Sequence, residues 1–423
     1  MKEDSVIEFK KPETNTTRDL LTEIARNGAK EMLAAALGLE VQAFLEAHQH
    51  EKMPTGESRL IRNGYLPERP IQTGIGSIEI KVPRVRDRAP LDKVKFSSSI
   101  IPPYLRRSKS MDEFLPLLYL KGISTGDFQE TLAPLLGEQA SNLSPGVISR
   151  LKSAWEGEYY QWHKRDLSKK TYVYWWVDGI YLQARMEDAR DCVLVVIGVN
   201  EQGQKELVAL EDGFRESKES WMELINHVKS LGLKNGPEVA TGDGALGFWA
   251  AIRETFPKTR HQRCWLHKTL NVLDKLPKTL QAKTKSDLHE IWMSPTRKDA
   301  DKAFDHFMTA YAAKYPKATE CLLKDKEPLL TFFDFPAEHW KPLRTTNPIE
   351  STFATVRHRT KKVKGCFSRT TILTMVFKLC QSAQKHWIRL HGFQRLAEVI
   401  RGVKFLNGES QLEGELINAR DAA

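Results

Sequence analysis

Hydrophobic and polar positions follow two different periods along this chain of 423 residues. Between residues 18 and 48, apolar side chains recur every three to four positions, which predicts an amphipathic helix. A period of two at residues 77–82 predicts a short strand. Helical spacing returns at residues 111–163, where Ser144 and Pro145 suit the cap and first turn of a helix. The first part of the chain is therefore predicted to be mainly helical.

The pattern changes near residue 171, where apolar runs of strand length begin. Residues 172–185, 192–199 and 206–210 predict three successive strands. Helix and strand then alternate, in the order helix 220–231, strand 238–241, helix 246–255 and strand 260–266. Three consecutive strands followed by this alternation predict an α/β fold with a mixed sheet.

The chain is too long for one simple core, and its changes of pattern predict six segments. The first is a helical region with short strands and a basic arm, and the second resembles a helix-turn-helix. An α/β core follows, interrupted by an all-helical insertion, and the tail has so little apolar content that we expect disorder. These segments are residues 1–110, 111–168, 169–274, 275–340, 341–403 and 404–423.

Charge favours a polyanionic partner. The 64 basic residues outnumber the 54 acidic ones, which gives a net charge of +10. Such an excess favours nucleic acid, although a merely solubilising surface is the alternative. Residues 81–109 form a basic arm that could lie along phosphates, and Arg150 and Lys152 could face a DNA groove. A solvated linker and an ordinary helical bundle explain these two features equally well.

Five scattered cysteines argue for a reducing cytoplasm rather than a disulfide scaffold. No apolar run approaches the roughly 20 residues that a membrane span needs, and the N-terminus does not read as a signal peptide. We therefore expect a cytoplasmic protein without a membrane partner.

Three carboxylates carry the candidate chemistry. Asp178 and Asp243 each lie beside a glycine at a predicted strand end, and Glu350 lies in the first turn of a predicted helix. Hard carboxylate oxygens suit Mg²⁺, with Mn²⁺ as a substitute, and two such ions can activate a nucleophile and stabilise a leaving oxygen at a phosphodiester. Singly, a turn, a helix cap and a capping box explain the three acids.

Basic and aromatic residues near Glu350 are candidates for DNA contact. Guanidinium groups match phosphate oxygens, and an indole can stack on an unpaired base, although most tryptophans lie in the core. The candidates are Trp340, Arg344, Asn347, Arg357, Arg359, Lys361 and Lys362. Cys264 and His267 have the spacing of a zinc pair, but no second pair completes four ligands. We expect His267 to hydrogen-bond in the site wall or touch a phosphate, and Cys264 to pack as a small apolar residue.

The sequence around the three acids resembles that of a known family. Val177-Asp178-Gly179-Ile180-Tyr181, Gly242-Asp243-Gly244-Ala245-Leu246-Gly247 and Thr345-Thr346-Asn347-Pro348-Ile349-Glu350 look like the three acidic motifs of Mutator-type bacterial insertion-sequence transposases. Arg263-Cys264-Trp265-Leu266-His267 resembles that family's Cys-x-x-His signature. The resemblance covers roughly residues 110–400.

That resemblance implies a ribonuclease-H-like catalytic core with a helical insertion before the last acid. It implies a DDE transposase in which Asp178, Asp243 and Glu350 bind metal, with Mg²⁺-dependent strand cleavage and transfer at terminal inverted repeats. Double-stranded DNA is the expected partner, in the bacterial nucleoid, and pairing two element ends makes a homodimer or larger assembly the expected state. The alternative is a catalytically silent DNA-binding regulator derived from a transposase.

Overall fold

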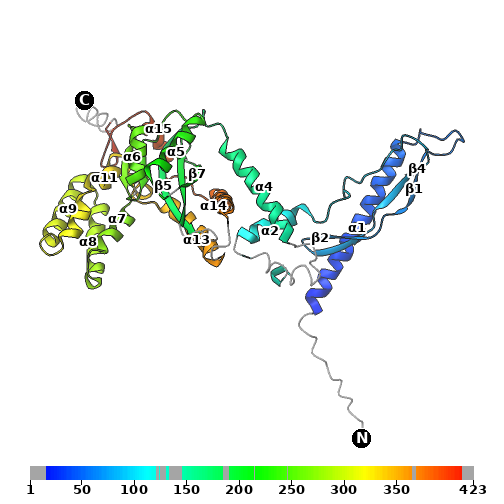
Figure 1. Cartoon of the computed structure of the whole chain (residues 1–423), viewed down its shortest axis with the longest axis horizontal. Helices are drawn as coiled ribbons and strands as arrows, with labels where there is room; N and C mark the ends of the chain where they lie inside the picture. The colour runs from blue at the N-terminus through cyan, green and yellow to red at the C-terminus, as the bar shows by residue number, and fades with distance from the viewer. Residues whose placement is uncertain are drawn as a thin grey trace, which may run out of the picture. The chain divides into compact units, whose positions relative to one another are not determined.

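The computed structural model describes residues 16–120, 123, 130–132, 145–183, 190–213, 215–244, 246–363 and 368–411. The chain divides into two compact units, Met1–Leu151 and Lys152–Ala423. Figure 1 shows their helices and strands. None of the helices in the described ranges is long and apolar enough to cross a membrane.

In the first unit, one long helix covers a small β-structure. Helix α1 (Thr16–Ala47) buries Leu37 against Ile71 and Ile78 of a hairpin. The hairpin turns at Gly76, whose φ of 106° favours glycine. Its strands are β2 (Arg69–Thr73) and β3 (Gly76–Ile80), while β1 (Leu60–Tyr65) pairs with β4 (Pro83–Asp87) and α2 (Lys109–Leu120) follows. The predicted helix and strand are both present.

The basic segment 81–109 is folded rather than a free arm. Strand β4 lies within it, and Asp87 accepts hydrogen bonds from the guanidinium of Arg59 at 3.0 and 3.1 Å. That interaction lowers the pKa of Asp87 to about 2. Further along, the hydroxyl and backbone N–H of Ser99 donate to Glu40 of α1. These interactions attach the basic segment to the rest of the unit, and its contact with DNA stays a prediction.

Helix α4 (Pro145–His163) begins at the predicted proline and continues eight residues beyond the expected end near Trp155. The connection that would form the turn of a helix-turn-helix lies outside the described residues, as does the Arg150 side chain. Lys152 is half-buried.

A five-stranded mixed sheet organises the second unit. Its order is β7–β6–β5–β8–β9; the first three strands are antiparallel, and β5, β8 and β9 are parallel. The α/β prediction is confirmed. The strands are β5 (Tyr172–Gln183), β6 (Arg190–Asn200), β7 (Lys205–Gly213), β8 (Val239–Gly242) and β9 (Arg260–Arg263).

Helices cover both faces of this sheet. Trp175 and Val177 of β5 pack with Trp221 of α5 (Lys218–Ser230) and Phe248 of α6 (Leu246–Thr255). Side chains alternate between faces along a strand, so Trp176 and Asp178 face the other side. There α13 (Asn347–Val363) packs on β5, and α14 (Arg369–Gln384) packs on β7 (Figure 1).

The predicted helical insertion lies between β9 and α13. The strand expected at 260–266 stops at Arg263, because its partner strand β8 ends at Gly242. The N–H of Trp265 instead donates to the carbonyl of Arg344 at 2.9 Å, and a helix begins. The insertion contains α7 (Trp265–Leu273), α8 (Lys278–Met293), α9 (Arg297–Tyr311), α10 (Pro316–Leu323), α11 (Lys326–Leu330), η1 (Thr331–Asp334), η2 (Ala337–His339) and α12 (Trp340–Leu343).

The chain end is more ordered than its composition predicts. After η3 (Phe393–Arg395) and α15 (Leu396–Ile400), strands β10 (Phe405–Leu406) and β11 (Glu409–Ser410) form a hairpin. Asn407 accepts a hydrogen bond from the N–H of Arg297 at 2.8 Å. The disorder expected from residue 404 is therefore wrong as far as Gln411, because contacts with distant parts of the chain hold the hairpin.

Candidate active site

Strand register brings the two aspartates to one level of the sheet. Trp176 of β5 is paired with Thr241 of β8, so the same register places Asp178 level with Asp243. Gly242 is paired with Arg263 of β9, which places Cys264 level with Asp243. The acids are 65 residues apart in sequence; Asp178 lies on β5, and Asp243 directly follows the adjacent parallel strand β8.

Asp178 lies within a strand and not at its end. Strand β5 continues to Gln183 because β6 pairs with it along its whole length. The alternative of an Asp178-Gly179 turn is wrong for the same reason. Strand β8, however, stops one residue before Asp243, so the parallel part of the sheet ends at this level and leaves the acids at its edge.

The electrostatics of Asp178 show how close the second acid is. Burial and then the charge of Asp243 raise the pKa of Asp178 to about 7, against smaller opposing effects of His267 and Arg357. Asp243 is fixed by its own backbone, since its carbonyl accepts hydrogen bonds from the guanidinium of Arg263 and from the indole of Trp249. Two neighbouring carboxylates in a buried place favour a proton or a cation.

Glu350 lies near His267, which is in turn close to both aspartates. In the first turn of α13, the Thr346 hydroxyl donates to Glu350 Oε1 at 2.7 Å. That oxygen lies 3.8 Å from His267 Nδ1. The hydrogen bond with Cys264, and then the charges of Asp178 and Asp243, raise the pKa of His267 to about 9. Glu350 therefore lies beside the His267 ring, and both aspartates are close enough to raise the pKa of that ring.

Cys264 and His267 link the insertion to α13. Cys264 caps the start of α7, and its Sγ accepts the N–H of Thr346 at 3.3 Å. Although burial opposes this, hydrogen bonds from His267 and Thr346 lower the pKa of Cys264. The thiol therefore has polar partners and is more than the small apolar residue that we expected.

Cys264 and His267 do not by themselves complete a structural zinc site. Ligand atoms of Cys264, His267 and Glu350 lie within 4.8 Å of one another. A structural zinc ion needs four protein ligands. The described residues supply no fourth protein ligand to this group.

Sequence reasoning missed an acid at this site. Glu216, just before α5, lines the same small cavity as Asp178 and Asp243. Burial, then Asp243 and Asp178, raise the pKa of Glu216 to about 7. Glu216 belongs to no periodic pattern and to no motif recognised in the sequence. It lies, however, against two glycines of the acidic motifs, Gly179 and Gly247, which leave room for it.

Two residues predicted to contact DNA have internal roles. Arg344 is buried, and its guanidinium donates to the carbonyl of Trp292, at the end of α8. Burial lowers its pKa to about 10. Trp340 donates to the carbonyl of Phe335 at 2.9 Å and packs edge-on against Phe333. Both side chains bind parts of the insertion to one another, and their contact with DNA stays a prediction.

Other predicted contacts remain accessible. Asn347, at the start of α13, and Arg357, further along it, are exposed. Arg357 is close enough to Asp178 to lower its pKa. The side chains of Arg359, Lys361 and Lys362 lie outside the described residues.

A second cavity, of about 240 Å³, adjoins Asp243 through Gly244. Arg253, Arg263 and Lys324 contribute positive charge to its lining. Asp325 is its one acid and already accepts hydrogen bonds from Arg263 and Lys268. Within the described part of the chain, neither Arg253 nor Lys324 has an ion-pair partner, so this cavity suits an anion.

Comparisons with known sequences agree on one family. The profile described as "Transposase, Mutator family" matches residues 1–390. The transposase for insertion sequence element IST2 of Acidithiobacillus ferrooxidans is 50% identical over 280 residues, which cover 66% of this chain and 95% of that protein. The transposase for IS6120 of Mycolicibacterium smegmatis is 47% identical over 298 residues, 70% of this chain and 92% of that protein.

A more distant relative extends the match. The transposase for ISRM5 of Rhizobium meliloti is 28% identical over 386 residues, covering 89% of this chain and 90% of its own. The similarity therefore spans both units and the insertion.

Proposed function

This chain belongs to the Mutator family of transposases, and from that premise we propose that it is a DDE transposase. It binds the terminal inverted repeats of an insertion sequence and catalyses Mg²⁺-dependent cleavage and transfer of DNA strands. The observation that carries the proposal is the convergence of Asp178, Asp243 and Glu350 around His267, at the edge of a mixed sheet. The sheet, its helical insertion and the last acid on α13 support a ribonuclease-H-like core.

The donor atoms at this site fit magnesium. The aspartates present hard oxygens, and Asp178 is buried beside a like charge that a divalent cation would neutralise. Asp178, Asp243 and Glu350 would hold the metal. Bound there, Mg²⁺ supplies a polarised nucleophile and a stabilised leaving oxygen.

The residues of the chain position these acids. The Thr346 hydroxyl holds one oxygen of Glu350, and Arg263 fixes the backbone at Asp243. His267 keeps a positive charge beside the acids, which favours their ionised form. Arg357, Arg253 and Lys324 are placed to neutralise phosphates of the bound strand.

The test is cleavage of a labelled element end with and without Mg²⁺. Asp178→Asn, Asp243→Asn and Glu350→Gln should each lower cleavage by about a thousandfold or more, because each removes a ligand that acts at the reacting phosphate. Affinity for the DNA end should change by less than about threefold, since the substitutions remove no positive charge. Asp305→Asn, at a side chain that is 78% exposed, is the matched control and should behave as the parent.

The same assay separates the alternative function. A catalytically silent regulator would bind the end and cleave it under no metal condition. Cleavage that survives any one substitution would remove that residue from the proposed triad. Size measurement of the DNA complex tests the proposed dimer, which would carry two ends per particle.

A further inference from the structure

Glu216 occupies a position that two motif glycines keep open. A Cβ at Gly179 would lie 2.5 Å from Oε1 and 2.7 Å from Cδ of Glu216, so any other residue at 179 would displace this carboxylate. A Cβ at Gly247 would collide with the backbone of Glu216 and Ser217. Gly179 directly follows Asp178, and Gly247 lies four residues after Asp243.

The side chain is also held in a defined direction. Ser217 caps α5, which fixes the backbone at Glu216, and the Tyr181 hydroxyl hydrogen-bonds to the carboxylate. Glu216 therefore lines the same narrow space as Asp178 and Asp243. Within the described ranges, no lysine or arginine forms an ion pair with Glu216.

A purely structural role of residue 216 would not require a carboxylate. A glutamine would accept the same Tyr181 hydrogen bond without adding a like charge beside two aspartates, and like charges at close range destabilise a fold. A carboxylate for which Gly179 leaves room beside two aspartates is explained when a cation balances it. Magnesium sites use carboxylate oxygens and waters, so one more acid can complete the ligand set.

We propose that Glu216 is a fourth carboxylate of the metal site, which binds or orients the divalent cation together with Asp178 and Asp243. The proposal rests on the proposed function and adds to it a residue that its acidic motifs do not contain. Gly179 acts through Glu216, as a positioning residue.

The test measures metal binding directly, by Mn²⁺ titration calorimetry and by the rise in Tm that Mg²⁺ or Mn²⁺ produces in the full chain. Glu216→Gln should weaken Mn²⁺ affinity by about 10- to 100-fold. Its Tm without metal should equal or exceed that of the parent, because a repulsive charge is gone. A residue that only supports the fold would give the opposite result, a lower Tm with unchanged metal affinity.

Gly179→Ala provides an independent test that leaves every carboxylate in place. Its backbone tolerates alanine, since Gly179 is not among the positive-φ glycines. It should weaken Mn²⁺ binding as Glu216→Gln does, and the double variant should be no weaker than either single one. Gly157→Ala, where an added Cβ meets nothing within 4 Å, is the control.

The outcomes separate this inference from the proposed function. If Glu216→Gln and Gly179→Ala bind Mn²⁺ as the parent does while Asp178→Asn does not, Glu216 is no ligand and the triad stands. If Asp178→Asn also binds Mn²⁺ as the parent does, the metal lies elsewhere and both proposals fail.

Discussion

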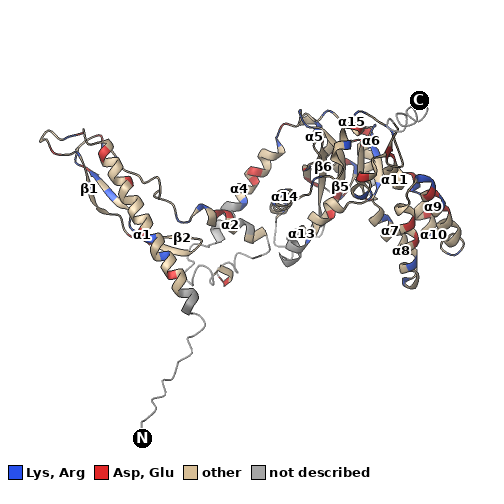
Figure 2. Cartoon of the chain, turned by 180° about the vertical axis from the view of Figure 1, so that it is seen from behind, with Lys and Arg blue, Asp and Glu red and all other residues tan. Residues whose placement is uncertain are grey.

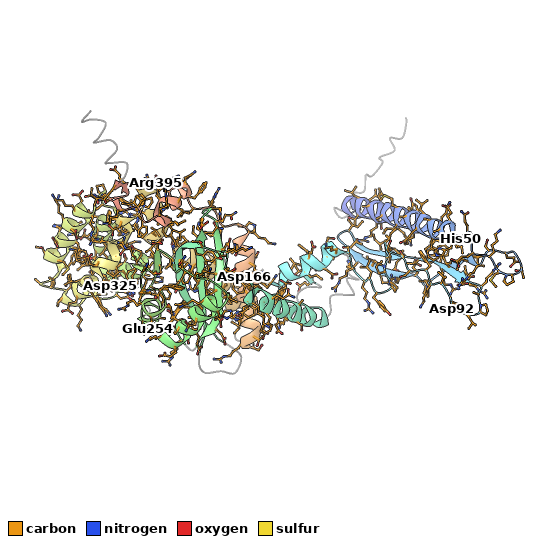
Figure 3. All side chains as sticks on the ribbon, turned by 90° about the horizontal axis from the view of Figure 1, so that it is seen from above. His50, Asp92, Asp166, Glu254, Asp325 and Arg395 are labelled. Carbon is orange, nitrogen blue, oxygen red and sulfur yellow. The ribbon has the colours of Figure 1, made fainter. Side chains whose placement is uncertain are left out.

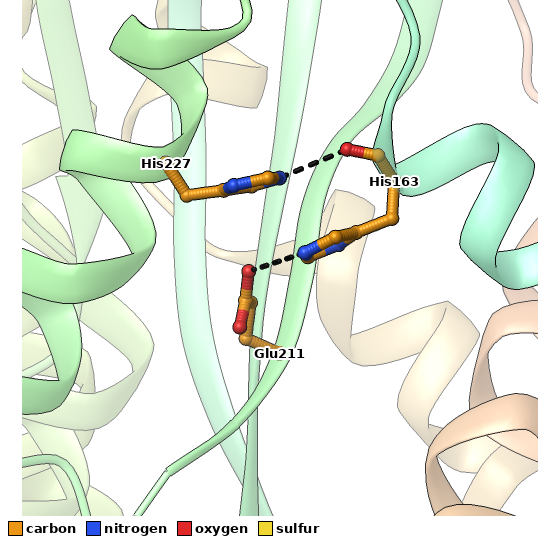
Figure 4. A group of neighbouring side chains, drawn as sticks. All are labelled: His163, Glu211 and His227. Carbon is orange, nitrogen blue, oxygen red and sulfur yellow. Dashed lines mark hydrogen bonds and ion pairs between the residues drawn. The ribbon is translucent and has the colours of Figure 1, made fainter.

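His163 at the end of α4, Glu211 on β7 and His227 on α5 form a group apart from the acid site (Figure 4). His163 Nε2 lies 3.3 Å from Glu211 Oε1, and the two imidazole rings stack with centroids 3.8 Å apart and planes 12° apart. Rings in parallel planes cannot both direct a lone pair at one ion, so this geometry opposes a shared metal. The His227 ring nitrogen instead bonds to the carbonyl of His163 at 2.9 Å.

This group makes the stability of the second unit depend on pH. Burial, then the charges of Asp212 and Glu223, raise the pKa of Glu211 to about 7 from 4.5. The folded chain therefore keeps a proton that the unfolded chain releases. The resulting stabilisation is complete below pH 4.5 and is lost as pH rises through 7.

Glu211→Gln should remove that dependence. Relative to the parent, the variant should gain roughly 1–3 kcal/mol in unfolding free energy between pH 4.5 and pH 7.5, because it has no buried carboxylate to ionise. Urea unfolding at a series of pH values measures the difference. Burial lowers the pKa of His163 to about 4, so His163 adds an acid-side loss of stability in both proteins. An unchanged difference across this range would contradict the assigned pKa.

Individual residues of the site could be predicted from the sequence only where they belong to a recognisable motif. The three acids stand in recognisable motifs, whereas Glu216 stands in a loop without periodicity and is revealed by what Gly179 contacts. Arg344 directly precedes the third motif, yet it is buried against Trp292. Sequence identifies a charged residue near a site but does not show which way its side chain points.

At the scale of elements, the observed strand pairing differs from the strand ends predicted from the sequence. Asp178-Gly179 read as a strand end because an acid and a glycine interrupt an apolar run, yet β6 pairs across both residues. Trp265 is predicted to lie in a strand together with apolar Cys264 and Leu266, but β8 ends at Gly242 and leaves no partner beside it. Periodicity predicts which segments form helices and strands. The ends of the strands depend on the strands paired with them, which lie far away in the sequence.

An ionic cluster around Asp325 joins the insertion to the sheet. Asp325, after α10 and labelled in Figure 3, accepts hydrogen bonds from Lys268 of α7 and from Arg263 of β9. The side chains of Lys268 and Arg263 are 4% and 10% exposed, and Asp325 is the counter-charge of both. Arg263 also bonds to the carbonyl of Asp243, which connects the cluster to the acid site.

Asp325→Ala should destabilise the chain by about 3–5 kcal/mol, because it leaves two buried cations without a counter-charge. Cleavage should fall as well at temperatures where the variant is folded, since Arg263 is released near Asp243. Urea unfolding and end cleavage are the measurements. Asp305→Ala, on the exposed side of α9, should change stability by less than about 0.5 kcal/mol. Similar losses in the two variants would show that the cluster has no special role.

At the scale of the whole molecule, the net charge of +10 does not by itself locate the DNA. Helices α1, α8 and α9 each carry both acidic and basic residues (Figure 2), so none of the three is charged with one sign alone. Arg253 and Lys324 differ because they line a cavity beside Asp243 without acidic partners among the described residues. Two hypotheses about DNA binding can therefore be separated. Either the basic residues of this cavity bind the DNA, or the net positive charge of the whole chain does.

Paired variants of equal charge can distinguish them. Arg253→Ala combined with Lys324→Ala removes two positive charges at the cavity, while Lys302→Ala combined with Lys317→Ala removes two from the outer helices of the insertion. Each phosphate contact contributes about 0.9 to the slope of log affinity against log salt, so the cavity pair should flatten that slope by up to about two. The outer pair should leave it nearly unchanged, because exposed charges far from the phosphates are screened. Fluorescence anisotropy of an element end across a salt series gives both slopes, and equal flattening would mean that total charge, not this cavity, governs binding.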